Sequence, residues 1–257
     1  MALKKTDRIK TKINGFDSLF KKGIPHGASI LIEGGPGSGK TNFCLQLCNN
    51  ICDQGLKVLF MSFEEPEDNL IEHMEEFGWN PKEQIKKGQL RIKRFNALDI
   101  ARSVEALLSE AKKELLIDIQ PVLIPKDFEP DIVCIDSLSA ISSAFTGEDA
   151  RFRIYMEQLF RYLESHNITT FLIRELANPT HIGNIYVEKG EAVSFLSDGI
   201  IAIYNVIGEN GRRERAIEVL KMRGEEIDTR IVKAKMINKK GFVVYPKEEL
   251  KGKYKLT

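Results

Sequence analysis

The sequence has no long apolar segment. No apolar run approaches the roughly 18 residues that a membrane-spanning helix needs, and the first ten residues, which carry four basic side chains, lack the apolar core of a signal peptide. We therefore expect a cytoplasmic protein that does not insert into membranes.

Net charge is also low. The 38 Lys and Arg residues nearly balance 37 Asp and Glu residues, which leaves a formal charge of +1. This balance gives no overall attraction to nucleic acid or to an acidic membrane surface. Lysines do cluster in residues 4–12 and 247–255. We interpret both clusters as solvated termini, with contact to an anionic partner as the alternative.

Cysteine is scarce, with four residues among 257. In a cytosolic chain this number argues against a disulfide framework. Cys44, Cys48 and Cys52 recur every fourth residue, which places them on one face of a helix. We expect these three, together with Cys134 in a strand, to be small core residues, and a metal site is the less favoured alternative.

The most informative segment that is present is Gly34–Thr41, which matches G-x-x-x-x-G-K-[ST] at every position. Glycines in such a loop let backbone N–H groups approach a polyphosphate closely. Lys40 supplies a positive charge and a catalytic contact, and Thr41 offers its hydroxyl to Mg²⁺. The predicted nucleotide-binding residues are Gly35, Pro36, Gly37, Ser38, Gly39, Lys40, Thr41 and Asn42.

The remaining pattern alternates buried strands with amphipathic helices, which predicts an α/β fold with a mostly parallel twisted sheet flanked by helices. The expected strands are residues 28–32, 58–63, 90–95, 131–136 and 169–173, and the expected helices are residues 42–50, 66–78, 100–116 and 150–166. Residues 200–206, 215–222 and a hairpin over 231–244 predict a C-terminal antiparallel β extension.

The chain shows no internal repeat and no linker, so we expect one domain over residues 1–246. Within it, residues 1–12 are expected to be loosely ordered, and a Lys- and Glu-rich tail follows at 247–257. Two stretches are expected to lack regular structure. Residues 117–130, with internal prolines, predict a surface insertion, and residues 175–195 predict a polar functional loop.

Asp136 follows an apolar strand, so its carboxylate lies at the carboxyl edge of the predicted sheet. A hard oxygen ligand opposite a phosphate loop suits Mg²⁺, and we expect Asp136 and Thr41 to form the metal site. The alternative is that Asp136 caps a helix beginning near Ser137.

Glu64 and Glu65 also stand at the carboxyl end of a strand. Hydrolysis needs a carboxylate that orients and deprotonates the attacking water, and either residue could supply it. Adjacent strand residues point to opposite faces, so only one of the two can face the water. A solvated acidic turn is the alternative interpretation.

A third group, Arg215, Lys221 and Arg223, is basic. If residues 215–223 form one regular strand, the three side chains share a face with two apolar residues between them. Cations at the end of this face suit a γ-phosphate, where positive charge stabilises the transition state. An exposed basic strand edge is the alternative.

Together these segments resemble the single-domain KaiC-like ATPases of the RecA superfamily, which are common in archaea, over residues 11–246. The segments that carry the resemblance are Gly15-Phe16-Asp17, Gly23-Ile24-Pro25 with Gly27, the Gly34–Thr41 loop, Ser62-Phe63-Glu64-Glu65, Ile135-Asp136-Ser137-Leu138-Ser139, Leu196-Ser197-Asp198-Gly199 and Leu220-Lys221-Met222-Arg223-Gly224.

The resemblance implies a RecA-like P-loop NTPase core that assembles into a ring, usually a hexamer, with ATP at the subunit interface. It further implies that Lys40 and Thr41 bind ATP and Mg²⁺ in cis and that Glu64 or Glu65 is the catalytic glutamate. Arg215, Lys221 and Arg223 would then reach the phosphates of the neighbouring subunit. ATP and Mg²⁺ are the implied cofactors, and other copies of the chain are the implied partners, with a further protein partner unidentified.

The chain also departs from its family. The clock proteins have two such domains, and they continue the basic motif with a small residue and a histidine, where this chain has Glu225, Glu226 and Ile227. Before the final hairpin glycine, Lys239 and Lys240 stand where the family often has an acidic residue. Where the clock proteins phosphorylate an adjacent Ser-Thr pair, this chain has Ser194 and Phe195. Autokinase activity is therefore a minor hypothesis.

We conclude from the sequence that the chain is an oligomeric, slowly hydrolysing ATPase that acts in assembly or signalling. One alternative is a RadA- or RecA-like DNA-binding recombination protein, which Arg151 and Arg153 favour. Against it, the loop at 175–195 contains a single lysine, Lys189. The other alternative is a nucleotide-gated switch with little turnover, although a pure switch has no need of a catalytic glutamate.

Overall fold

The computed structural model describes residues 7–103, 124–125, 127–145, 147, 149–176, 191–208, 211–250 and 254–256. Three expected segments lie mostly outside these residues. They are the helix at 100–116, the insertion at 117–130 and the loop at 175–195. Lys189 lies outside them too, as do the basic residues of 1–6 and 251–253.

A ten-stranded sheet forms the centre of the molecule, in the order β11-β10-β9-β8-β3-β7-β6-β4-β5, with β12 paired to β8. The parallel strands are β3 (Ser29–Gly34), β4 (Val58–Ser62), β5 (Leu90–Arg94), β6 (Ile132–Asp136), β7 (Thr169–Glu175) and β8 (Gly199–Gly208). The antiparallel strands are β9 (Arg213–Met222), β10 (Val232–Ile237), β11 (Gly241–Glu249) and β12 (Tyr254–Leu256). This arrangement confirms the α/β fold with its C-terminal antiparallel extension.

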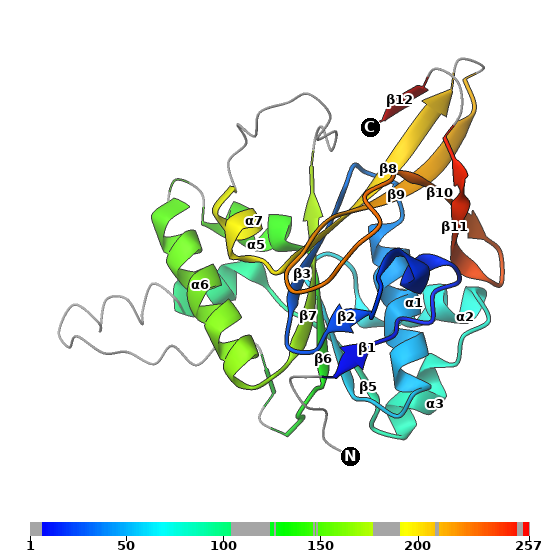
Figure 1. The fold of residues 1–257 in the computed structure, drawn as a ribbon. Coiled ribbons are helices and arrows are strands. Elements are labelled where there is room, and N and C mark those ends of the chain that lie inside the picture. The colour runs from blue at the N-terminus through cyan, green and yellow to red at the C-terminus, as the bar shows by residue number, and fades with distance from the viewer. Residues whose placement is uncertain are drawn as a thin grey trace.

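Helices cover both faces of the parallel part of the sheet (Figure 1). On one side lie α1 (Lys40–Cys52), α2 (Glu67–Glu76) and α3 (Pro81–Lys86), and on the other lie α5 (Leu138–Ala144), α6 (Asp149–Ser165) and α7 (Glu191–Leu196). Parallel strands buried on both faces need continuous apolar sequence, and β6 is such a run. None of the described helices is long and apolar enough to cross a membrane.

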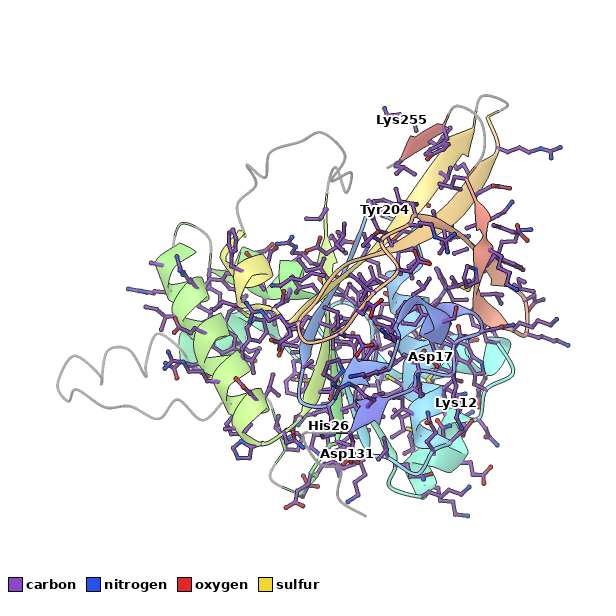
Figure 2. The ribbon with its side chains drawn as sticks, in the orientation of Figure 1. Lys12, Asp17, His26, Asp131, Tyr204 and Lys255 are labelled. Carbon is purple, nitrogen blue, oxygen red and sulfur yellow. The ribbon has the colours of Figure 1, made fainter. Side chains whose placement is uncertain are left out.

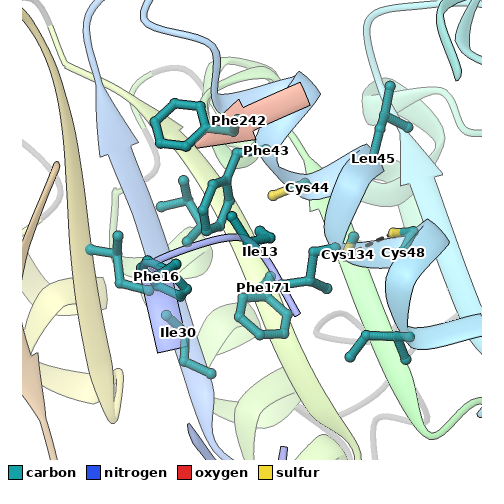
Figure 3. Close-up of a cluster of buried hydrophobic side chains, with 14 of the residues drawn as sticks. Ile13, Phe16, Ile30, Phe43, Cys44, Leu45, Cys48, Cys134, Phe171 and Phe242 are labelled. Atoms are coloured by element: carbon teal, nitrogen blue, oxygen red, sulfur yellow. Dashed lines mark hydrogen bonds between the residues drawn. The ribbon is translucent and has the colours of Figure 1, made fainter. Parts of the chain in front are cut away.

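Strand alternation divides the core between the two faces of the sheet. In β3, Ile30 and Ile32 pack on the α1 side, while Leu31 packs on the α6 side. On the α1 side, edge-to-face ring contacts link Phe16, Phe43 and Phe242 at centroid distances of 5.1 and 5.4 Å (Figure 3). These contacts tie the segment before the sheet, the helix α1 and the strand β11 into one core.

All four cysteines lie in this core, as the sequence predicts. The Cys48 and Cys134 sulfurs are 3.4 Å apart, across the contact between α1 and β6 (Figure 3). Burial raises the pKa of each of the four thiols, which keeps them protonated and chemically inert.

Among the described residues, regular structure extends into residues 7–12 and 247–256. Strand β1 (Arg8–Ile9) pairs with β2 (Ile24–Pro25), and the 3₁₀ helix η1 (Phe16–Leu19) lies between them in the sequence. The Asp17 carboxylate accepts hydrogen bonds from the backbone N–H groups of Thr11 and Lys12, beside α1 (Figure 2). At the other end, β11 continues past the expected boundary at residue 246, and Lys255 in β12 pairs with Ile207 of β8 (Figure 2).

Candidate nucleotide site

The loop that connects β3 to α1 follows the Gly34–Thr41 motif. Gly37 and Gly39 adopt φ angles of 72° and 102°, in the left-handed region that favours glycine. A Cβ atom on Gly34 would lie 2.3 Å from the backbone oxygen of Ile203, so that position has no room for a side chain. Pro36 and Gly37 form the exposed tip of the loop.

Ser38 is fully buried within this loop, and its hydroxyl has no hydrogen-bond partner among the described residues. A buried hydroxyl without a partner is costly, and a ligand oxygen at this place could accept its hydrogen bond. The loop therefore fits the phosphate group that its sequence motif predicts.

Lys40 begins α1 with a side chain that is only 6% exposed. Its ammonium donates to the backbone oxygens of Gly34 and Gly35 at 3.0 and 3.1 Å, and it lies 3.4 Å from the Glu175 carboxylate. These contacts hold the positive charge inside the loop, where an incoming polyphosphate would meet it.

Thr41 and Asp136 meet as the metal prediction requires. The Thr41 hydroxyl donates to the Asp136 carboxylate at 2.7 Å. Burial raises the pKa of Asp136 to about 6, and the nearby carboxylates of Glu64 and Glu65 add to the rise, while the Thr41 hydrogen bond and the Lys40 charge oppose it.

In the described part of the chain, no group of three or more His, Cys, Asp or Glu residues is arranged to hold a metal ion. A cation beside Asp136 and Thr41 would therefore take its remaining ligands from phosphate oxygens and water. This is the usual coordination of Mg²⁺ at nucleotide sites.

Glu64 and Glu65 follow β4, whose last residue, Ser62, pairs in register with Asp136. The Glu64 carboxylate accepts a hydrogen bond from the Ser137 hydroxyl, beside the metal pair. The Glu65 carboxylate instead lies 3.7 Å from the His73 ring on α2. The two adjacent carboxylates thus point to different neighbours.

Arg215 does not lie with Lys221 and Arg223, so the expected common face is wrong. Strand β9 has an irregular register opposite Ile200 and Ile201, so that Leu220 is an extra residue between the paired positions. Val219 and Met222 therefore join the same core cluster although they are three residues apart. The extra residue reverses the alternation before Lys221.

Arg215 lies at the carboxyl edge of the parallel strands, where β9 begins. Its guanidinium donates to the backbone oxygens of Ser38 and Gly37 at 3.0 and 3.2 Å. Asn205, which pairs with Arg215 across β8 and β9, donates to the backbone oxygen of Pro36. The phosphate loop of the chain is therefore supported by its own Arg215.

Lys221 and Arg223 lie at the other end of β9, about 20 Å away along an extended strand. The Lys221 ammonium donates to the backbone oxygens of Ser194 and Ser197, and burial lowers its pKa. Arg223 donates to the backbone oxygen of Phe195 and pairs with Asp198. Both cations thus surround the end of α7, which contains the candidate phosphorylation residue Ser194.

Several residues of the site were not predicted. Glu175 and Asn205 approach the loop because β7 and β8 flank β3, an order that a single sequence does not reveal. Ser137 could have been identified, since a serine directly after a strand is a common helix N-cap, and its hydroxyl does accept from the Ala140 N–H. On α1, Gln46 accepts from the Phe242 N–H and holds the last hairpin against the phosphate-loop helix.

Comparisons with known proteins agree with this geometry. A family model described as "ATPase: KaiC" matches residues 9–249. The circadian clock oscillator protein KaiC of Nostoc sp. is 31% identical over 225 residues, which cover 85% of this chain and 40% of the relative. The circadian clock protein KaiC3 of Synechocystis sp. is 28% identical over 241 residues, which cover 93% of this chain and 46% of that protein.

The matches to these curated relatives therefore span less than half of their length. Among solved structures, a KaiC-like protein of the archaeon Pyrococcus horikoshii OT3 superposes with a TM-score of 0.72 at 25% identity, covering 94% of this chain and 100% of that one. The family model and this structural match together identify the chain as a member of the KaiC ATPase family with a RecA-like fold.

Proposed function

We propose that the chain is a slow, Mg²⁺-dependent ATPase that works at interfaces between copies of itself, in assembly or signalling. The observation that carries the proposal is the convergence of three groups at one edge of the sheet. The ammonium of Lys40 lies inside the phosphate loop, the Thr41 and Asp136 oxygens are 2.7 Å apart, and Glu64 stands beside them. Such a set has the parts that phosphoryl transfer to water requires.

Each residue has a role in this proposal. The loop N–H groups and Lys40 bind and neutralise the phosphates, and Thr41 and Asp136 hold the cation. Mg²⁺, when bound, would supply charge stabilisation between the phosphates. Glu64 orients the attacking water and accepts its proton, with the Ser137 hydroxyl fixing the carboxylate. Glu65, directed towards His73, is assigned no proton transfer.

The basic residues divide between two subunits in this proposal. Arg215 supports the loop of its own chain through Ser38 and Gly37. Lys221 and Arg223 lie too far from that loop to touch a nucleotide in it, so a phosphate that they contact belongs to a second copy. This division requires an oligomer in which one copy's β9 end meets the next copy's loop, which is a head-to-tail contact of the kind that builds a ring when its rotation closes.

The test is phosphate release from Mg²⁺·ATP by the wild type and by the Glu64→Gln and Glu65→Gln variants. Typical enzymes turn over at about 1–1000 per second, and we expect a wild-type value well below this range. Glu64→Gln should lose about 10²- to 10⁴-fold, as expected for removal of a general base, and Glu65→Gln should stay within about threefold of the wild type because its carboxylate faces α2.

Nucleotide binding, measured separately by titration with a fluorescent ATP analogue, should survive in both variants. If the wild type binds ATP but releases no phosphate, the ATPase proposal fails and a nucleotide-gated switch replaces it. If Glu65→Gln is the inactive variant, the assignment of the base is wrong while the ATPase proposal stands.

A further inference from the structure

The turn that follows β9 carries an acidic residue in an unusual place. Glu225 comes two residues after Arg223, and its side chain is only 1% exposed. Its carboxylate accepts a hydrogen bond from the Lys22 backbone N–H and lies 3.7 Å from the Arg8 guanidinium. A buried carboxylate is costly unless it is paired, so this position is built to hold a charge.

The next residues continue the contact with the same part of the chain. The Lys21 N–H donates to the backbone oxygen of Glu226 at 3.1 Å, and the Asp228 N–H donates to that of Leu19 at 2.9 Å. Between them, Phe20 and Ile227 form an antiparallel bridge. Residues 225–228, which we call the anchor segment, are thus bound along residues 19–22.

On its other side the anchor segment adjoins the cations of β9. Gly224 adopts a φ of 70°, which turns the chain sharply between Arg223 and Glu225. The Arg223 N–H donates to the backbone oxygen of Asp198 at 2.8 Å. The turn that presents Arg223 and Lys221 is therefore fixed by the start of β8 on one side and by the anchor segment on the other.

The stretch of chain that leads into residues 19–22 is itself attached to α1. Asn50 of α1 and Gln54, two residues past the end of that helix, donate to the backbone oxygens of Thr11 and Lys10, both at 3.1 Å. The Phe16 ring packs against Phe43 near the start of α1 and against Phe20, which the anchor segment contacts. Packed and hydrogen-bonded groups thus run without a break from the helix that begins with Lys40 to the turn that presents Arg223.

We propose that Glu225 is a positioning residue, which anchors the Lys221–Arg223 turn so that both cations meet the nucleotide polyphosphate bound by a second copy of the chain. The inference rests on the proposed function. A carboxylate cannot itself bind a phosphate, and this one faces inward, so Glu225 acts through Arg223 and Lys221.

The test compares Glu225→Gln with Glu226→Gln. The exchange removes one carboxylate charge in each, but Glu225 is buried and Glu226 is 73% exposed, where ion pairs contribute little. For Glu225→Gln we expect kcat to fall about 10-fold with nucleotide affinity of the loop within about twofold of the wild type, since the loop is intact. Glu226→Gln should keep both values within about twofold.

Two further measurements separate positioning from general damage to the fold. The triple variant Glu225→Gln, Lys221→Ala, Arg223→Ala should be no slower than the double variant Lys221→Ala, Arg223→Ala, because cations that are already absent cannot be misplaced. Glu225→Gln chains mixed with Lys40→Ala chains should regain activity, because the Lys40→Ala chain supplies a correctly held turn to the partner's intact loop.

A further loss in the triple variant, no recovery in the mixture, or equal effects of the Glu225 and Glu226 exchanges would each overturn the inference. So would full activity of Glu225→Gln alongside an inactive Lys221→Ala, which leaves the proposed function in place. If Lys221→Ala is active, the trans contacts of the proposed function are wrong. The inference about Glu225 is then wrong as well, because it rests on those contacts.

Discussion

The two ends of strand β9 carry cations in different surroundings. At its beginning, the Arg215 guanidinium donates to two backbone oxygens of the phosphate loop in the same chain. At its end, Lys221 and Arg223 donate to backbone oxygens around α7, on the opposite edge of the parallel strands. The beginning of β9 thus supports the phosphate loop of its own chain, and its end carries two cations at the opposite edge of the sheet.

The two edges also concentrate charge of opposite sign. Beside the phosphate loop, burial and the neighbouring Glu64 and Glu65 raise the pKa of Asp136, as expected where negative charge is crowded. At the far end, burial and the nearby Arg223 lower the pKa of Lys221. A crowded positive edge favours an anion, and the function proposed above assigns the polyphosphate of the next copy to this edge.

The largest expected effect comes from mixing two inactive chains. Lys40→Ala and Lys221→Ala should each lower turnover at least about 100-fold, because each removes a charge that the transition state needs. Co-assembled in equal amounts, they should recover about a quarter of the wild-type rate, since one interface in four then joins an intact loop to an intact Lys221. Phosphate release from heteromers purified through two different tags measures this recovery.

The matched control replaces Lys221→Ala by Arg215→Ala. Lys40 and Arg215 serve the same loop, so no interface of this mixture combines both intact residues around one nucleotide. The mixture should show no more activity than the Arg215→Ala chains it contains. Recovery in the Arg215 mixture would place Arg215 in trans, and absence of recovery in the Lys221 mixture would place Lys221 in cis or outside the site.

The sequence predicted the parts of this comparison that depend on local pattern. The phosphate loop, the strand ending in Asp136 and the strand containing Arg215 and Lys221 were located from short motifs and apolar runs, and the α/β fold was confirmed. Local sequence did not reveal the extra residue at Leu220, because a strand irregularity depends on pairing with the neighbouring β8. One inserted position was enough to separate side chains that regular alternation places together.

Partners that come from sheet order were equally hidden. Glu175 reaches Lys40 only because β7 lies beside β3, and Asn205 reaches Pro36 only because β8 lies on the other side. The short helix α3 was missed, and α5 was expected only as the alternative interpretation of Asp136, since six or seven residues give too little periodicity to identify a helix. Long-range neighbours, not local conformation, limited the prediction of the site.

A smaller effect should separate the two ends of β9 by kinetics. Arg215→Ala should raise KM about 5- to 10-fold with a modest change in kcat, because it loosens the loop that binds ground state and transition state alike. Lys221→Ala should lower kcat and leave the nucleotide affinity of the loop unchanged. Steady-state kinetics with a parallel nucleotide titration measure the split, and a loss confined to kcat in Arg215→Ala would argue against its role as loop support.

The smallest effect concerns stability at the acidic edge. Between the unfolded pKa near 3.8 and the folded value of about 6, the folded chain holds more protons on Asp136, so stability falls as the pH rises through this range. Above this pH range, the buried carboxylate lowers the free energy of unfolding by a constant amount. Asp136→Asn should therefore raise the stability of the nucleotide-free protein by about 1–2 kcal/mol at pH 7.5, or a few degrees in Tm, because the amide oxygen can still accept from Thr41.

At pH 5, about midway between the two pKa values, the gain should be roughly half of that at pH 7.5, because the unfolded chain has already released the Asp136 proton that the folded chain retains. Thermal unfolding at both pH values measures the difference. The other end of β9 provides the control. Lys221→Met removes no carboxylate, so the stability difference between this variant and the wild type should not grow between pH 5 and pH 7.5. A gain for Asp136→Asn of equal size at both pH values would show that packing, and not the buried charge, separates the two proteins. A gain that roughly doubles from pH 5 to pH 7.5 would mean that the acidic edge sacrifices stability for a carboxylate that a cation can use.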